Sequence, residues 1–169
     1  MDTTSGLGLP PPFDEAIRRH EREILRFISR VTGNRDDALD LFQETCLRAY
    51  RAWPTLDSEN GVRPWLFRIA TNLCRNRARD MARRSRVIVA TGPNVTDQAD
   101  AHSSLNHSRD GMIDISGAIR ALPEKQRLAF AMRKLTGMDY SEIADALGCS
   151  QESARASVYQ ALKKLRALE

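Results

Sequence analysis

The stretch from Asp139 to Leu165 constrains the fold most, because it predicts two short helices joined by a tight turn. Asp139 and Glu142 have the spacing of a capping box, which starts a helix. Gly148 ends that helix where a left-handed backbone is needed, and Ser150 caps a second helix. The pattern is typical of a helix-turn-helix unit, whose second helix enters the major groove of DNA. The apolar positions of that second helix are Ala154, Val158, Ala161 and Leu165.

The opposite face of the second helix carries polar and cationic side chains. Such groups bind phosphates and base edges in duplex DNA. A plain helical hairpin in a small bundle has the same pattern, so both interpretations stay open for this stretch alone. The outward residues are Gln151, Glu152, Arg155, Tyr159, Gln160, Lys163 and Lys164.

Positive charge is concentrated in one segment of the chain. The formal net charge is +4, yet residues 62–86 contain eight arginines and a single acid, Asp80, so the remainder is net acidic. A focused basic segment favours a polyanion such as nucleic acid. An anionic membrane surface is the alternative, but the amide side chains between the arginines disfavour it.

Helical periodicity recurs through most of the chain, and no stretch alternates as a strand does. We therefore expect an all-α protein with two small helical domains joined by a flexible linker, the C-terminal domain being the helix-turn-helix domain. Turn formers without periodicity mark the linker. The expected segments are a disordered tail at residues 1–12, a first domain at 13–84, a linker at 85–112 and a second domain at 113–169.

Two helices of the first domain have candidate partner faces. The helix predicted from Arg35 to Trp53, capped by Asn34, carries Leu47 within a charged face, which is typical of a partner surface with a small hydrophobic centre. The helix beginning near Pro64 alternates arginines with amides on one face, a composition suited to phosphates and base edges. Trp65 near its start could stack on an unpaired base, and packing in the core is an equal alternative.

Cysteines, histidines and acids show no pattern of a catalytic or metal site. The three cysteines are far apart at apolar helix positions, so we expect small core residues in a reducing compartment. The one carboxylate cluster, from Asp36 to Glu44, lies along a single helix with no histidine near it, which disfavours nuclease chemistry. No signal peptide or membrane-length apolar run occurs. We expect a cytoplasmic protein that is not an enzyme, with no cofactor, metal or small-molecule substrate.

Three stretches together resemble the extracytoplasmic-function (ECF) sigma factors of bacteria. The family's core-binding region 2 helix is similar to DALDLFQETCLRAYRAW, and its −10-facing helix is similar to RPWLFRIATNLCRNRAR. The family's region 4 is similar to ALPEKQRLAFAMRKLTGMDYSEIADALGCSQESAR. The three occur in the family's order, and the resemblance covers nearly the whole chain.

The resemblance implies three sets of site residues. The core polymerase-binding set is Asp37, Asp40, Leu41, Gln43, Glu44 and Leu47. The −10 DNA-binding set is Leu56, Asn60, Trp65, Arg68, Asn72, Arg75, Asn76 and Arg79, with the first two in the loop that would capture a flipped base. The −35 DNA-binding set is Gln151, Glu152, Ser153, Arg155, Tyr159 and Lys163. The chain departs from the family at Ser157, where an arginine is usual, and at Glu152, where glycine is usual.

The resemblance also implies a function and its partners. An alternative sigma factor binds core RNA polymerase at its clamp and flap, directs promoter recognition and −10 melting, and so starts transcription. The implied partners are core polymerase, promoter DNA and an anti-sigma factor, which is commonly bound to the membrane. The main alternative is a one-component helix-turn-helix regulator. That class needs a ligand pocket or phosphoacceptor in the first domain, and no aspartate there follows a buried strand.

The expected linker limits the distance between the two domains. A promoter spacer of about 17 base pairs is roughly 60 Å long. About 28 linker residues span roughly 30 Å as a relaxed coil and roughly 95 Å when fully extended. We therefore expect the free protein to be more compact than the polymerase-bound protein.

Overall fold

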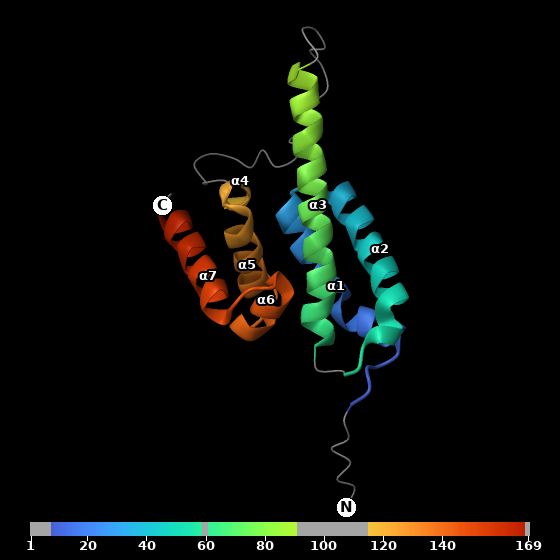
Figure 1. The fold of residues 1–169 in the computed structure, drawn as a ribbon. Helices are drawn as coiled ribbons and strands as arrows, with labels where there is room; N and C mark the ends of the chain where they lie inside the picture. Colours follow the sequence, from blue (N-terminus) through green and yellow to red (C-terminus); the bar gives the residue numbers. More distant parts are fainter. Residues whose placement is uncertain (1–7, 59–60, 91–114, 168–169) are drawn as a thin grey trace, which may run out of the picture.

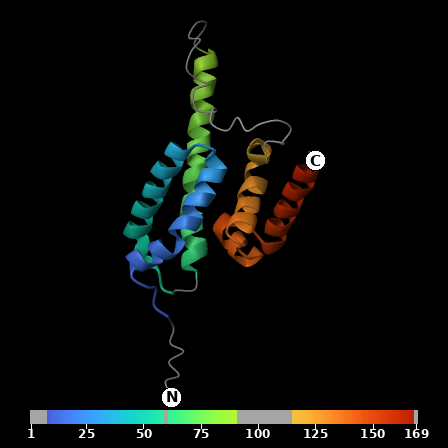
Figure 2. The same cartoon turned by 180° about the vertical axis from the view of Figure 1, so that it is seen from behind.

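The computed structural model describes residues 8–58, 61–90 and 115–167, and these residues form helices without any strand, as the sequence predicts. Figure 1 shows two helical units side by side, with α1 to α3 in one and α4 to α7 in the other, and Figure 2 shows the same arrangement from behind. The elements are α1 (Phe13–Thr32), α2 (Arg35–Ala52), the 3-10 helix η1 (Trp53–Thr55), α3 (Val62–Ala90), α4 (Ile115–Ala121), α5 (Glu124–Leu135), α6 (Tyr140–Leu147) and α7 (Gln151–Arg166).

Local capping explains where several of these helices begin and end. The side chain of Asn34 accepts hydrogen bonds from the first-turn N–H groups of α2. The capping box predicted for Asp139 and Glu142 is present, with distances of 2.8 and 3.0 Å for its two hydrogen bonds. Gly148 has φ 64°, the left-handed conformation expected at the end of α6. Ser150 accepts from the backbone N–H of Ser153 at 3.1 Å, which starts α7.

One helix is longer than the sequence predicts. α3 continues to Ala90, so residues 85–90, expected at the start of the linker, are helical. In Figure 1 the second half of α3 projects beyond the other helices. The remainder of the expected linker, and most of the expected N-terminal tail, lie outside the described residues.

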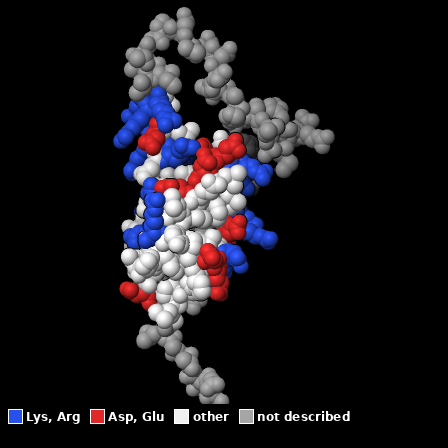
Figure 3. Space-filling view, turned by 90° about the vertical axis from the view of Figure 1, so that its right-hand side faces the viewer, with Lys and Arg blue, Asp and Glu red and all other residues white. Residues whose placement is uncertain are grey.

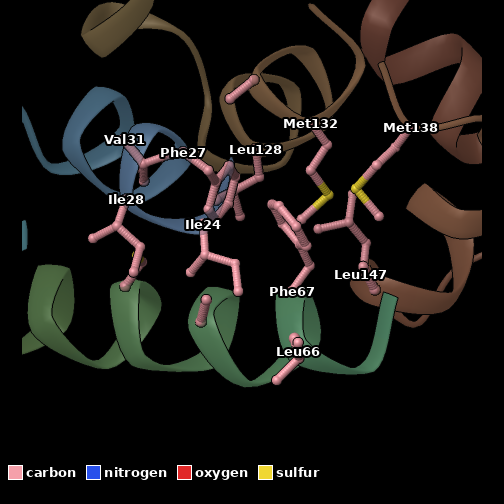
Figure 4. Packing of buried hydrophobic residues seen from close by; sticks show 14 of the residues in the cluster. Ile24, Phe27, Ile28, Val31, Leu66, Phe67, Leu128, Met132, Met138 and Leu147 are labelled. Carbon is pink, nitrogen blue, oxygen red and sulfur yellow. The ribbon is translucent and has the colours of Figure 1, made fainter. Parts of the chain in front are cut away.

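The two helical units share one hydrophobic core. Phe27 of α1 and Phe67 of α3 are fully buried and pack edge to face, with ring centroids 5.2 Å apart. Leu128 and Met132 of α5 are buried in the same cluster, and Figure 4 shows them pointing toward these rings. Met138, which leads into α6, is also fully buried there. The C-terminal unit therefore packs directly against the N-terminal unit.

Candidate nucleic-acid and partner interfaces

The second helix of the helix-turn-helix unit, α7, presents one exposed polar face. Its opposite face is buried through Ala154, Val158 and Ala161, as the apolar spacing predicts. The free face suits base edges and phosphates, because it offers cations, an amide and a phenol. Five of the six expected −35 contacts are exposed on it, as are Gln160 and Lys164; the five are Gln151, Glu152, Arg155, Tyr159 and Lys163.

The sixth expected −35 residue, Ser153, lies on the flank of α7 that faces α5. Its hydroxyl oxygen is 2.6 Å from Lys125 Nζ, which donates to it. Ser157, at the position where the family often has arginine, is buried, and its hydroxyl donates to the Ser153 carbonyl at 2.8 Å. The hydroxyl groups of both serines therefore have hydrogen-bond partners within the C-terminal unit.

An aromatic ring stands beside the exposed arginine of α7. Tyr140, the first residue of α6, has its ring centroid 5.2 Å from Cζ of Arg155. Cζ of Arg133, on α5, lies 5.0 Å from the same centroid. Arg133 also donates from Nη1 to the Met138 carbonyl at 2.8 Å. The sequence analysis did not single out Tyr140 or Arg133, because both contacts join separate helices.

The candidate −10 face of α3 is partly free and partly covered. Arg68, Asn72, Asn76 and Arg79 are exposed. Arg75 is half-buried, and its Nε lies 2.7 Å from a carboxylate oxygen of Glu124 at the start of α5. The helix therefore offers its amides and two of its expected arginines outward, while the third is paired with the C-terminal unit.

Near the start of α3, two of the expected −10 residues are half-buried and pack against the core. Trp65 is half-buried, with its ring 6.0 Å from that of Trp53, which favours packing over stacking on a base in this arrangement. Phe13 packs edge to face on Trp53 at 5.4 Å. Leu56 is half-buried against the core. Asn60 lies outside the described residues.

Contacts between the units gather around the first turns of α3. Arg63 forms an ion pair with Glu142 of α6 at 3.2 Å and with Glu23 of α1 at 3.0 Å. It also donates to the carbonyl oxygen of Thr136. Arg68 lines a groove whose other wall is the helix-turn-helix turn around Gly148. The C-terminal unit thus lies over part of the face that the sequence assigns to −10 DNA.

The free end of α3 adds cations that the expected site did not include. Arg83, Arg84 and Arg86 are all exposed. Lysine and arginine side chains gather at the upper end of the molecule in Figure 3, over the projecting part of α3. Their charge was counted in the basic segment, but the length of the helix that carries them came only from the structure.

The expected partner face of α2 is exposed in its central part. Asp40 and Gln43 are exposed, Glu44 is half-buried and pairs with Arg48 at 2.7 Å, and Leu47 is 43% exposed. This face combines acids with an apolar centre, as expected for a partner surface.

Two of the expected polymerase-binding residues contact the rest of the first unit instead. Leu41 is 8% exposed and belongs to the core, because it sits on the buried stripe with Ala38 and Thr45. Asp37 is paired with Arg77 of α3. Two exposed residues that the sequence analysis did not include, Leu39 and Tyr50, extend the apolar part of the face.

Burial shifts the pKa of two cysteines and one histidine among the described residues. Burial raises the pKa of the Cys74 thiol to about 12. Burial also raises the pKa of Cys46 and lowers that of His20, the latter opposed by the Glu23 carboxylate. Within the described residues, no group of three metal-ligating side chains occurs, and no helix is long and apolar enough to cross a membrane.

Comparisons with known proteins place the two units in one family. The family model for Sigma-70 region 2 matches residues 16–84, and that for Sigma-70, region 4 matches residues 113–165. Together they cover more than half of the chain, in the order that the sequence resemblance implies. The chain belongs to the sigma-70 family.

A similar protein of known name indicates to which group of that family the chain belongs. The chain is 30% identical over 170 residues to the ECF RNA polymerase sigma factor SigE of Mycolicibacterium smegmatis, an alignment that covers 98% of this chain and 65% of the relative. The chain thus spans about two thirds of that relative's length. The match supports membership of the ECF sigma factors.

Two solved structures share the fold. The sigma factor RpoE of Bartonella quintana, in complex with the anti-sigma factor NepR, has a TM-score of 0.69 and 22% identity, covering 92% of this chain and 95% of that one. CnrH in complex with the cytosolic domain of CnrY has a TM-score of 0.65 and 24% identity, covering 92% and 86% of the two chains. Because each likeness covers 92% of the chain, it includes both helical units.

Proposed function

We propose that the protein is an alternative RNA polymerase sigma factor that binds core polymerase and directs it to promoters. The observation that carries this proposal is that one chain holds regions 2 and 4, each with an exposed candidate face. In this proposal, the exposed face of α2 binds core polymerase, α3 binds the unpaired −10 strand, and α7 binds duplex −35 DNA.

The proposed mechanism uses binding energy and needs no covalent step. Contacts on α7 hold the −35 duplex and position the chain on the promoter. Cations and amides on α3 bind the −10 strand only after its bases unpair, so this binding offsets the few kcal/mol that unpairing each base costs. We therefore propose that the chain is not an enzyme and needs no cofactor.

We also propose that the chain opens when it acts. Arg63 and Arg75 are paired with carboxylates of the C-terminal unit, whereas the faces of α2 and α7 remain exposed. Polymerase can therefore bind α2 before the two units separate. Separation would then release the arginine face of α3 for DNA, in agreement with the compact free state expected from the linker length.

An anti-sigma factor is the inhibitory partner that we propose. Both similar solved structures contain a bound protein, which is the anti-sigma factor NepR on RpoE in one and the cytosolic domain of CnrY on CnrH in the other. A partner that holds the two units together would keep Arg63 and Arg75 from DNA.

The direct test is co-elution of the purified chain with bacterial core polymerase on a sizing column, with a housekeeping sigma factor as competitor. Saturable one-to-one binding that the competitor displaces is the expected result. The double variant Asp40→Arg and Glu44→Arg should lose binding, while Asp14→Arg, a charge reversal on α1, should keep it. Absence of binding by the unchanged protein, together with specific binding of free protein to duplex DNA, would instead favour the one-component regulator.

A further inference from the structure

We propose that Tyr140 is a positioning residue for −35 recognition, which holds the guanidinium of Arg155 against its ring. This inference rests on the proposed function, because it assigns Arg155 to promoter DNA. It adds a residue outside the exposed face of α7 to the determinants of specificity.

The ring is placed rigidly by its neighbours in the chain and in space. Tyr140 directly follows Asp139, the N-cap of α6, and the capping box fixes the backbone on both sides. Tyr140 is half-buried and packs against the core. The guanidinium of Arg133 lies 5.0 Å from the ring centroid and is itself held by the Met138 carbonyl. Motion of the ring is therefore restricted before DNA arrives.

Arg155 is the mobile partner of this ring. It lies in the first turns of α7, and its side chain is exposed. Across the described residues, no carboxylate lies within ion-pair distance of it. The contact at 5.2 Å with Tyr140 is the interaction that limits its rotamers. A long cationic side chain loses rotamer entropy on binding, and a side chain already held in place loses less.

The chemistry of the contact leaves Arg155 able to read DNA. A cation–π contact of this kind is made with the ring, and the guanidinium keeps its N–H donors for other acceptors. Those donors suit the O6 and N7 acceptors of guanine or two phosphate oxygens. Arg133 places a second positive charge at the ring, so an arriving acceptor is attracted by both guanidinium groups.

The test compares Tyr140→Leu with Tyr140→Phe, which keeps the ring and serves as the matched control. Holoenzyme made from each variant is assayed on a promoter series with single base changes in the −35 element. Tyr140→Leu should lower discrimination about twofold to fivefold at the base pair that Arg155→Ala affects, as the strength of an exposed cation–π contact predicts. Tyr140→Phe should retain the discrimination of the unchanged protein.

A double-mutant cycle separates positioning from general stabilisation. If Tyr140 acts through Arg155, Tyr140→Leu should have no further effect on discrimination in the Arg155→Ala background. The proposal would be overturned if the two substitutions lowered discrimination by independent factors that multiply in the double variant. It would also be overturned if Tyr140→Leu lowered promoter use equally at every base pair. An Arg155→Ala variant that leaves −35 discrimination unchanged would overturn it as well, while normal holoenzyme formation in that variant would leave the sigma-factor function standing.

A measurement on the free protein tests the contact without polymerase. The side-chain protons of Arg155 should show ring-current shifts in NMR spectra that Tyr140→Leu removes and Tyr140→Phe preserves. Unchanged Arg155 shifts in Tyr140→Leu would contradict the proposal, even if the chain failed to bind core polymerase. Melting temperatures of both variants identify any loss caused by unfolding alone.

Discussion

The guanidinium of Arg75 lies 2.7 Å from the carboxylate of Glu124, an ion pair that joins α3 to α5 across 49 residues of chain. The sequence assigns Arg75 to the −10 strand. A carboxylate of the same protein therefore forms an ion pair with a side chain that is expected to bind DNA phosphate. Arg63 and Glu142 form a second ion pair between the units, at the start of α3 and across 79 residues, although Arg63 is not among the expected −10 contacts. The compact arrangement and the proposed DNA-bound arrangement therefore compete for the positive charge of Arg75.

We predict that neutralising these carboxylates favours the open protein. The double variant Glu124→Gln and Glu142→Gln removes both negative charges, and glutamine at the second position can still complete the capping box. Because the pairs are partly exposed, each contributes no more than about 1 kcal/mol. Free protein should therefore bind a −10 single-stranded oligonucleotide more tightly, by at most about fivefold per pair.

The measurement is fluorescence anisotropy of a labelled oligonucleotide, with energy transfer between labels on the two units. Glu15→Gln, which removes a pair with Arg19 inside α1, is the matched control and should change neither signal. Unchanged energy transfer in the double variant would show that the ion pairs do not hold the units together.

The shared core predicts that both units unfold together. Leu128 of α5 is 1% exposed and packs in the same cluster as Phe27 of α1. Leu128→Ala should lower the free energy of unfolding by about 2–5 kcal/mol, because it leaves a cavity in that core. Urea unfolding followed by circular dichroism should show one transition that shifts as a whole.

The control for this experiment is an apolar residue of the same unit outside the core. Ile115 of α4 is 60% exposed. Ile115→Ala should change the free energy of unfolding by less than about 0.5 kcal/mol. Two separate transitions, with only one moved by Leu128→Ala, would contradict a shared core.

Cys74 should report the opening of the two units. Its side chain is buried, and burial raises its thiol pKa to about 12, weakly opposed by the positive charge of Arg127 on α5. At pH 8 the thiol is protonated and covered, so it should react very slowly with a thiol reagent, and its reactivity should rise only as the pH approaches 12. Adding core polymerase should speed its labelling at constant pH.

The labelling experiment uses the variant Cys46→Ser and Cys149→Ser, so that Cys74 is the one thiol left. Bovine serum albumin in place of core polymerase is the control for nonspecific effects. Labelling that stays slow when polymerase is bound would contradict the exposure of Cys74 by opening.

The apolar centre of the α2 face should contribute to polymerase binding without contributing to stability. Leu47 is 43% exposed, so Leu47→Ala should leave the melting temperature nearly unchanged. Truncation of a central apolar residue in an interface typically costs about 1–2 kcal/mol, equivalent to roughly fivefold to thirtyfold in affinity. Titration of labelled protein with core polymerase measures this loss, and unchanged affinity would remove Leu47 from the proposed interface.

The sequence predicted the helices and their exposed faces because both depend on local chemistry. Asn34, Asp139 and Ser150 cap their helices through hydrogen bonds to the next few residues, and such bonds can be inferred from spacing. The exposed face of α7 follows from apolar residues three and four apart. The linker was expected from residue 85, whereas α3 continues to Ala90, because the turn formers that mark the linker begin only at Thr91.

What covers each face was decided by the tertiary structure alone. Periodicity shows that Arg75 lies on a polar face, but it cannot show that Glu124 would meet it. The family resemblance assigned Leu41 to a partner surface, although it packs in the core. Periodicity likewise left Tyr140 without a role, because its contact with Arg155 joins separate helices. Local spacing determined the helices and their faces in this protein, whereas contacts between residues far apart in the chain decided which cations remain free for DNA.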